Sequence, residues 1–198
     1  VSLKVVTRGE LELIWRMRSI KCIGQTHCLE AGQVSKVICS FPRSAKSVVF
    51  QDLYKAGKIE LEVVPQGTLA ERLRASGAGI GGFFTPTSAS TPLAEGKETR
   101  VIDGKDHVLE LPIRADVALI KADKADPWGN LTYRKAARNF APNMAMAAAL
   151  TIVQARVIVG LGDIDPEQVV TPSIFVDRIV EVSDPVSEAA ALLEQTNA

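Results

Sequence analysis

Short runs of β-branched residues, separated by turns and by segments with helical spacing, constrain the fold of this chain more than any other feature. Residues 34–41 (VSKVICSF) and 59–64 (IELEVV) have the composition of strands, and the second run alternates apolar and acidic residues. Residues 47–56, between them, carry apolar side chains at helical spacing and end before Gly57. Strands interleaved with helices predict an α/β fold.

The same alternation continues in the second half of the chain. Residues 115–122 (ADVALIKA) predict a buried strand, and residues 99–102 and 107–111 flank Asp103-Gly104, which is typical of a hairpin. A hairpin among crossover connections predicts a mixed sheet. Further expected elements are an Ala/Met helix over 142–150, strands over 151–159 and 174–182, and a weak amphipathic helix from Pro185 to the end.

Charge and cysteine content exclude several classes of function. Lys+Arg and Asp+Glu number 23 each, so there is no basic surplus of the kind that binds nucleic acid or a membrane surface. The three cysteines form no metal-ligand spacing, and their odd number argues against a closed set of disulfides. No apolar run approaches the roughly 20 residues that span a bilayer, and the charged start is unlike a secretory signal. We therefore expect a cytoplasmic protein.

Residues 66–82 contain the polar and glycine-rich features of most interest. Thr68-Leu69-Ala70-Glu71 fits a capping box that opens a helix through about Ser76. Gln66 precedes it, where a side-chain amide either donates to an oxyanion or stabilises the turn, and physical reasoning leaves both open. Gly77–Gly82 suits a backbone that closely approaches a ligand, but it lacks the strand–turn–helix setting of a dinucleotide site, so a flexible loop is the alternative.

Other candidate groups carry less information. There is no GxSxG, HExxH or P-loop lysine motif, and neither His27 nor His107 has an evident base or metal partner, which favours structural roles for both. A basic cluster could bind a carboxylate or phosphate, because guanidinium groups contact such anions in pairs, or could be a solvated face. Its members are Arg134, Lys135, Arg138 and Asn139.

Several longer runs are distinctive: CSFPR (39–43), YKAGKIELE (54–62), VPQGTLAER (64–72), GAGIGGFFTPT (77–87), LAEGKETR (93–100), ALIKADKADPWGNLTYRKAARNF (118–140) and VTPSIFVDRIV (170–180). On these runs the chain resembles the A-type subunits of the family I 3-oxoacid CoA-transferases, most closely those that act on 3-oxoadipate. The resemblance covers about residues 30–182 and is specific at many separate places.

The resemblance implies a three-layer α/β domain with a mixed, mostly parallel sheet, and an active site between an A half and a B half. It also implies a ping-pong reaction in which a glutamate takes CoA from succinyl-CoA as a thioester and passes it to a 3-oxoacid. The family's glutamate lies in a Ser-Glu-Asn-Gly stretch of the B half, and this chain contains no Glu-Asn-Gly. The implied partner is therefore a B-type subunit, in a heterodimer or heterotetramer.

The resemblance further implies that no metal and no cofactor beyond the CoA thioester is needed. It favours 3-oxoadipate over acetoacetate as acceptor, and so a role in aromatic compound catabolism through the beta-ketoadipate pathway. Gln66 matches the family's oxyanion glutamine, and the basic cluster becomes an anion or subunit contact. The residues that match the family's substrate and CoA-binding loop are Gly77, Ala78, Gly79, Ile80, Phe83, Phe84 and Thr85.

Two departures from the family pattern divide the chain into an atypical segment (1–30), an A-type domain (31–183) and a C-terminal tail (184–198). Residues 1–30 show no comparable order and lack the family's glycine-rich opening, which predicts that the first βα unit is missing or replaced. Ser88-Ala89-Ser90-Thr91 stands where the family has Gly-Tyr-Gly-Thr, removing two glycines where positive φ is needed.

These departures support an alternative in which the chain is a non-catalytic remnant or a protein that binds a B-type subunit. A third hypothesis, an isomerase acting on a sugar phosphate, rests on fold analogy alone. The specific motif matches argue against it.

Overall fold

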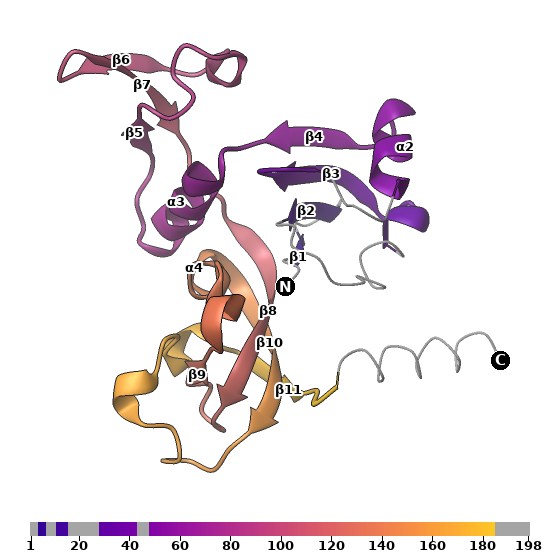
Figure 1. Ribbon diagram of the computed structural model, residues 1–198, viewed down its shortest axis with the longest axis vertical. Coiled ribbons are helices and arrows are strands. Elements are labelled where there is room, and N and C mark those ends of the chain that lie inside the picture. The colour runs from indigo at the N-terminus through magenta and orange to yellow at the C-terminus, as the bar shows by residue number, and fades with distance from the viewer. Residues whose placement is uncertain (1–3, 7–10, 16–27, 43–47, 185–198) are drawn as a thin grey trace.

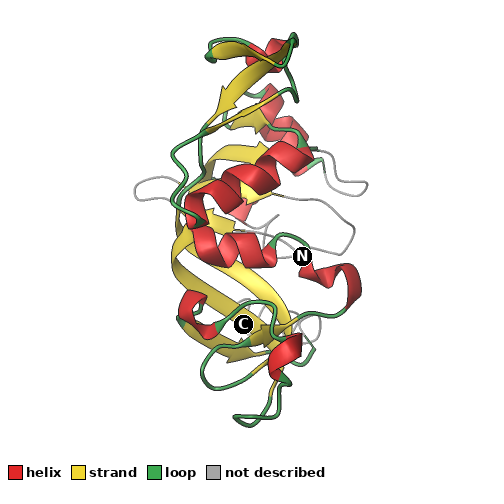
Figure 2. Cartoon of the chain, turned by 90° about the vertical axis from the view of Figure 1, so that its left-hand side faces the viewer, coloured by secondary structure: helices red, strands yellow, loops and turns green. Residues whose placement is uncertain are grey.

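The computed structural model describes residues 4–6, 11–15, 28–42 and 48–184. Figure 1 shows an elongated molecule in which three sheets follow one another along the long axis, and Figure 2 shows the helices gathered beside them. The fold is α/β, as expected. One three-stranded sheet is parallel, and the five-stranded sheet is mixed, with three parallel strands and two antiparallel partners.

The N-terminal sheet is parallel throughout and has the order β2 (Leu11–Trp15), β3 (Val34–Cys39), β4 (Glu60–Val63). Helix α2 (Val49–Lys55) connects β3 to β4. Six buried side chains from these elements and their flanks pack together: Leu29, Val34, Val37, Cys39, Phe50 and Ile59. The predicted strands and the helix between them are confirmed, each slightly shorter than expected.

Two strands lie within residues 1–30, where the sequence pattern gave no sign of regular elements. β1 (Lys4–Val6) pairs antiparallel with β8, and β2 pairs parallel with β3. Strands this short are determined by the partner that supplies their hydrogen bonds rather than by their own propensity, so local sequence gives little sign of them. Because β2 pairs with β3, that edge of β3 is not left exposed.

The central sheet has the order β1, β8 (Ala115–Ala125), β10 (Ala148–Ile158), β11 (Arg178–Glu181), and β9 (Leu131–Thr132) also pairs with β8. β8, β10 and β11 are parallel to one another. The face built from alternate residues such as Ala118, Ile120 and Val153 is buried, which is the period-2 pattern of a half-covered sheet.

Helices α3 (Gln66–Gly77) and α4 (Ala141–Ala147) pack against each other and α4 packs on β8 and β10. Leu69, Leu73 and Met144 are buried there. The predicted capping box is wrong: α3 begins at Gln66 with Pro65 as N-cap and no side-chain cap, and Thr68 lies inside the first turn, buried. Tertiary packing of Thr68 prevails over its preference for a helix end.

The third sheet, which we call the arm, is antiparallel with the order β5 (Phe83–Thr85), β7 (Lys105–Glu110), β6 (Thr99–Ile102). The predicted hairpin is confirmed, and Asp103 and Gly104 both have positive φ, at 51° and 71°, as a two-residue turn of type I′ requires. The one-turn helix η1 (Pro92–Ala94) lies between β5 and β6.

Three further one-turn helices adjust the predicted boundaries: η2 (Lys135–Arg138), η3 (Pro166–Gln168) and η4 (Ser173–Phe175). The helix expected over 142–150 ends at Ala147, because residues from Ala148 on pair with β8. The strand expected over 174–182 begins only at Arg178, after η4. The amphipathic helix expected from Pro185 lies outside the described residues.

Candidate functional site

Gln66 is the first residue of α3, directly after the end of the parallel strand β4. Its side chain is exposed. Pro65 provides no side-chain cap and the first turn of α3 contains no acidic residue, so the positive end of the helix dipole is not neutralised within that turn. An amide at this position can therefore donate to an anion that also meets the positive end of α3.

The glycine-rich stretch begins at the other end of the same helix. Gly77 is required for packing, because a Cβ there would lie 2.4 Å from the Cβ of Met146 on α4. Gly79 has φ +69° and closes α3 in a Schellman motif, with Ile80 N–H donating to Ala75 O and Gly79 N–H to Ser76 O. Both glycines are thus required by the local structure. The sequence alone could not distinguish this requirement from a role in lining a ligand site.

After α3 the chain turns back and reaches β5, as Figure 1 shows. Ile80 is exposed and Phe83, Phe84 and Thr85 are half-buried. The Arg100 guanidinium lies 4.6 Å from the centroid of the Phe84 ring. A helix of 12 residues is about 18 Å long, so Gln66 and Gly77 are separated by nearly that distance. Residues after Gly77 can approach Gln66 only because the chain turns back toward β5.

The loop after β5 contains the residues that depart from the family pattern. Ser88 and Ser90 have φ values of +72° and +58°, in the left-handed region that favours glycine. Within the described residues, the Ser88 hydroxyl is buried without a hydrogen-bond partner. The Ser90 hydroxyl lies 3.3 Å from Asp106 Oδ2, beside an open pocket of about 440 Å³ that Arg100 also lines. The serines have kept a glycine-like backbone.

The basic cluster lies on η2, before α4. Arg134, Lys135 and Arg138 are exposed, and Lys135 and Asn139 have positive φ. Burial raises the pKa of nearby Tyr133 to about 12, while its hydrogen bond to Thr171 and the charge of Arg138 act in the opposite direction. The cluster therefore presents cationic groups on a different helix from the one that carries Gln66.

A series of buried and half-buried charged side chains, which the sequence did not reveal, joins α3 to its neighbours. Arg72 Nη1 lies 2.6 Å from Glu62 Oε1 on β4, and Lys36 Nζ lies 3.2 Å from Glu62 Oε2. Burial alone would raise the pKa of Glu62, but Arg72 and Lys36 outweigh burial and lower it. The alternation of apolar and acidic residues in β4 gave no sign of these partners.

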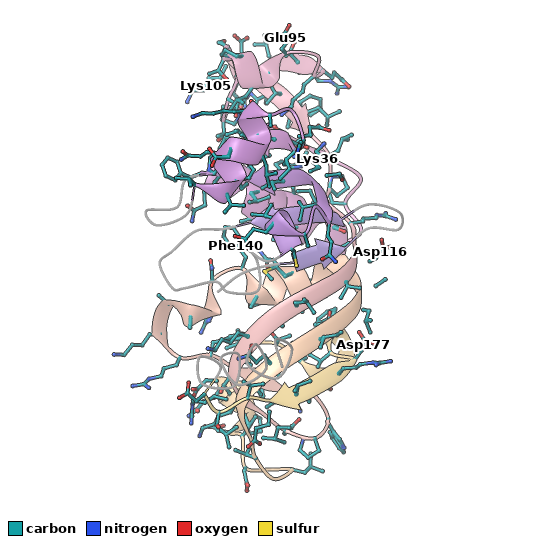
Figure 3. All side chains as sticks on the ribbon, turned by 90° about the vertical axis from the view of Figure 1, so that its right-hand side faces the viewer. Lys36, Glu95, Lys105, Asp116, Phe140 and Asp177 are labelled. Carbon is teal, nitrogen blue, oxygen red and sulfur yellow. The ribbon has the colours of Figure 1, made fainter. Side chains whose placement is uncertain are left out.

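Glu110, at the end of β7, belongs to the same series of charged side chains, and its own side chain is only 2% exposed. Its carboxylate lies 2.6 Å from Lys97 Nζ and 3.8 Å from Arg72 Nε. We call these five residues, Lys36, Glu62, Arg72, Lys97 and Glu110, the charge chain. Figure 3 shows Lys36, a member of this charge chain, in the upper part of the molecule, away from Asp177, which directly precedes β11.

A second buried carboxylate, Asp126, organises the loop between β8 and β9. Its Oδ1 accepts from the N–H groups of Trp128, Gly129 and Asn130, and its Oδ2 from the Asn130 amide. Burial alone would raise the pKa of Asp126, but these hydrogen bonds lower it. Trp128, on this hydrogen-bonded loop, is 68% exposed.

The comparison with protein families decides the ancestry. Residues 10–182 match the family model described as coenzyme A transferase. The chain belongs to the coenzyme A transferase family. The resemblance stated from the sequence runs is thereby confirmed, and so is the prediction of a CoA-transferase.

Curated relatives are similar over most of the chain. The A-type subunit of the 3-oxoadipate CoA-transferase of Pseudomonas putida is 62% identical over 169 residues, which are 85% of this chain and 73% of that protein. The same subunit from Acinetobacter baylyi is 60% identical over 84% of this chain and 73% of its own length. The A-type subunit of the succinyl-CoA:3-ketoacid coenzyme A transferase of Xanthomonas campestris is 51% identical over 86% and 69%.

Solved structures in the family share the fold. The acyl-CoA transferase of Escherichia coli O157:H7 superposes with a TM-score of 0.70 at 23% identity, over 82% of this chain and 37% of that one. The glutaconate coenzyme A-transferase of Acidaminococcus fermentans gives 0.68 at 20% identity, over 80% and 58%. The chain thus spans little more than a third of the first of these proteins.

Two further observations bear on the class of protein. Across the described ranges, no helix is both long and apolar enough to cross a membrane. Within the same ranges, no three His, Cys, Asp or Glu side chains are grouped as metal ligands. The absence of a cofactor and the cytoplasmic location remain predictions, as do the roles of Gln66, the glycine-rich stretch and the basic cluster.

Proposed function

We propose that this chain is the A-type subunit of a CoA-transferase that moves CoA from succinyl-CoA to a 3-oxoacid, with 3-oxoadipate favoured over acetoacetate. The similarity to the corresponding subunits of two 3-oxoadipate CoA-transferases, at 62% and 60% identity, supports this acceptor. The partner is a B-type subunit, since the curated relatives are themselves named as one subunit of a larger enzyme. The reaction requires no metal and no cofactor beyond the CoA thioester.

The nucleophile in this proposal is a glutamate of the B-type subunit. Its carboxylate attacks the thioester carbonyl of succinyl-CoA and expels the CoA thiolate, which leaves a mixed anhydride of glutamate and succinate. The thiolate then attacks the glutamyl carbonyl of the anhydride, forming the glutamyl-CoA thioester and releasing succinate. The carboxylate of the 3-oxoacid then attacks the glutamyl thioester and expels the CoA thiolate. The thiolate attacks the 3-oxoacyl carbonyl of the resulting anhydride, which gives the 3-oxoacyl-CoA and regenerates the free glutamate carboxylate. Each acyl transfer passes through a tetrahedral oxyanion, which is the species that this chain must stabilise.

The observation that carries the proposal is the position of Gln66, exposed at the uncapped and locally uncompensated N-terminus of α3. Its side-chain Nε2 donates to the oxyanion while the helix dipole supplies a favourable potential. Donors of this kind contribute about 3 kcal/mol to transition-state stabilisation in other acyl transfers. Ile80, Phe83, Phe84 and Thr85 form the wall that faces the acyl and CoA chain.

The test is CoA transfer measured with this chain alone and with a B-type subunit that carries a Ser-Glu-Asn-Gly stretch. We expect turnover only in the mixture, and faster with 3-oxoadipate than with acetoacetate. Gln66→Ala should lower kcat by more than about tenfold while the complex still forms. Turnover unaffected by Gln66→Ala would remove this residue from the mechanism.

The loop after β5 supports a second candidate function, that of a non-catalytic subunit that only binds its B-type partner. Ser88 and Ser90 occupy a left-handed backbone without glycine, and the Ser88 hydroxyl is buried. A stable complex without turnover, together with turnover restored by the double substitution to glycine, would favour this candidate. Full activity of the natural sequence would exclude it.

A further inference from the structure

Arg72 lies near the middle of α3 and contacts three separate acceptors. Its Nη1 lies 2.6 Å from Glu62 Oε1 on β4, its Nε donates to the Leu111 carbonyl at 2.7 Å, and its Nε lies 3.8 Å from Glu110 Oε2. The side chain is only 13% exposed. The backbone takes part as well, because Ile113 N–H donates to the Arg72 carbonyl at 3.0 Å. One residue therefore attaches α3 both to β4 and to the end of β7.

The end of β7 controls where β5 lies. Glu110 is the cross-strand partner of Phe83, the first residue of β5. Its carboxylate is held by Lys97 on one oxygen and faces Arg72 on the other. Whatever fixes residues 110 and 111 against α3 therefore also fixes the start of β5, which carries the proposed substrate wall.

We propose that Arg72 is a positioning residue that sets the distance between Gln66 and β5. The inference rests on the proposed function, because it assigns the two ends of this arrangement to the oxyanion and to the acyl-CoA. Gln66 and Gly77 lie at opposite ends of α3, so the helix alone cannot hold the oxyanion donor near the substrate wall. The contacts of Arg72 bring the returning strand into a fixed position beside the helix.

Arginine suits this role for a geometric reason. Its planar guanidinium carries five N–H donors in a fixed fork, so it can bind a carboxylate and a carbonyl in different directions at once. A lysine ammonium at the same place is a point charge on a flexible stem and lacks this fixed fork of donors. Arg72→Lys should therefore retain the charge and lose most of the positioning.

The same helix offers a matched control. Arg74 forms an exposed pair with Glu71 at 2.8 Å, with both side chains 47% exposed, and reaches neither β4 nor β7 through any contact among the described residues. Arg74→Gln removes an arginine from α3 without touching the charge chain. Its kcat and KM should equal those of the wild type.

The test is a double-mutant cycle in the complex with the B-type subunit, using Gln66→Ala, Arg72→Gln and the combination. If Arg72 acts through the position of Gln66, Arg72→Gln lowers kcat at least tenfold alone and less than threefold when Gln66 is already alanine. A purely structural role would reduce the folded fraction equally in both backgrounds and leave the kcat of the folded complex unchanged. Additive losses in kcat would overturn the inference.

Amide hydrogen exchange gives a readout that does not depend on turnover. Arg72→Gln, but not Arg74→Gln, should raise exchange at Ile113 and through Phe83–Thr85 at least tenfold. Unchanged exchange at both places would overturn the inference even if the complex is inactive. Should Arg72→Gln fail to fold, Arg72→Lys, which keeps the charge, makes the same test.

The two proposals fail in different ways. No CoA transfer by the wild-type pair would contradict the proposed function, while the exchange experiment would still decide whether Arg72 holds β5 to α3. Transfer by the wild-type pair with additive losses in the cycle would contradict only the role of Arg72.

Discussion

Two carboxylates are buried in the part of the chain that the structure describes, and they are stabilised in different ways. Asp126, 3% exposed, accepts hydrogen bonds from three backbone N–H groups and one amide, all within four residues along the chain. Glu110, 2% exposed, faces the side chains of Lys97 and Arg72, which are 13 and 38 residues away. The first carboxylate organises its own loop, whereas the second holds the arm against α3.

The difference has a physical consequence. Backbone donors are already ordered by the turn that Asp126 creates, so little further entropy is lost in binding the carboxylate. Lys97 and Arg72 must give up side-chain freedom and hydration to meet Glu110, and such pairs contribute less than their Coulomb attraction suggests. We therefore expect the local site to be the more important for stability and the long-range one for position.

The largest expected effect is that of Asp126→Ala. Three N–H groups and the Asn130 amide would lose their acceptor together, and the free energy of unfolding should fall by about 3 kcal/mol. Chemical denaturation measures this change. Asp163→Ala is the control, since Asp163 accepts one N–H, from Gly160, on an exposed loop, and its loss should be under about 1 kcal/mol. Equal losses would contradict the comparison.

Glu110→Gln should have a smaller effect on stability, about 2 kcal/mol, because Lys97 is 32% exposed and can regain water and Arg72 keeps Glu62. The control is Glu98→Gln, which breaks an exposed pair with Arg100 and should change the unfolding free energy by less than about 0.5 kcal/mol. A loss at Glu110 that exceeds the loss at Asp126 would reverse the order proposed here.

Acid should reveal the Asp126 site specifically. Its folded-state pKa is lowered from the ordinary value of 3.8, so its stabilisation is fully present above that value and is lost as the pH falls through the lower folded pKa. The wild type should therefore lose more unfolding free energy than Asp126→Asn between about pH 5 and about pH 2. Parallel curves for the two proteins would show that this carboxylate makes no pH-dependent contribution.

The smallest expected effect concerns the backbone of the loop between β5 and β6. Ser90→Gly should raise the unfolding free energy by about 0.5 kcal/mol, because relief of the left-handed strain slightly exceeds the added entropy of glycine in the unfolded chain. Gly79, at the end of α3, has a similar left-handed backbone, and Gly79→Ala should lower the unfolding free energy by about 1 kcal/mol. Thermal denaturation of both variants measures the pair, and a loss at Ser90→Gly would show that the serine side chain stabilises the loop.

Local sequence determined much of this protein. Periodicity identified β3, β4, α2, the hairpin of the arm and β8, because each of these elements buries one face or uses a turn whose residues are chemically distinctive. The family could also be identified from local sequence, since many short runs matched it independently. Gln66 could be named because a polar side chain stands between a strand end and a helix start.

Only the tertiary structure decided the rest. β1 and β2 are strands because β8 and β3 pair with them, and Thr68 lies inside α3 because packing prevails over capping. Gly77 must be glycine because Met146, 69 positions away, packs against it. Glu110 is paired with Lys97, which follows η1, and with Arg72 on α3. Sequence spacing describes interactions within a few residues, whereas these contacts depend on chain segments that meet only after folding. The partners of Asp126 lie within four residues and those of Glu110 do not, for the same reason.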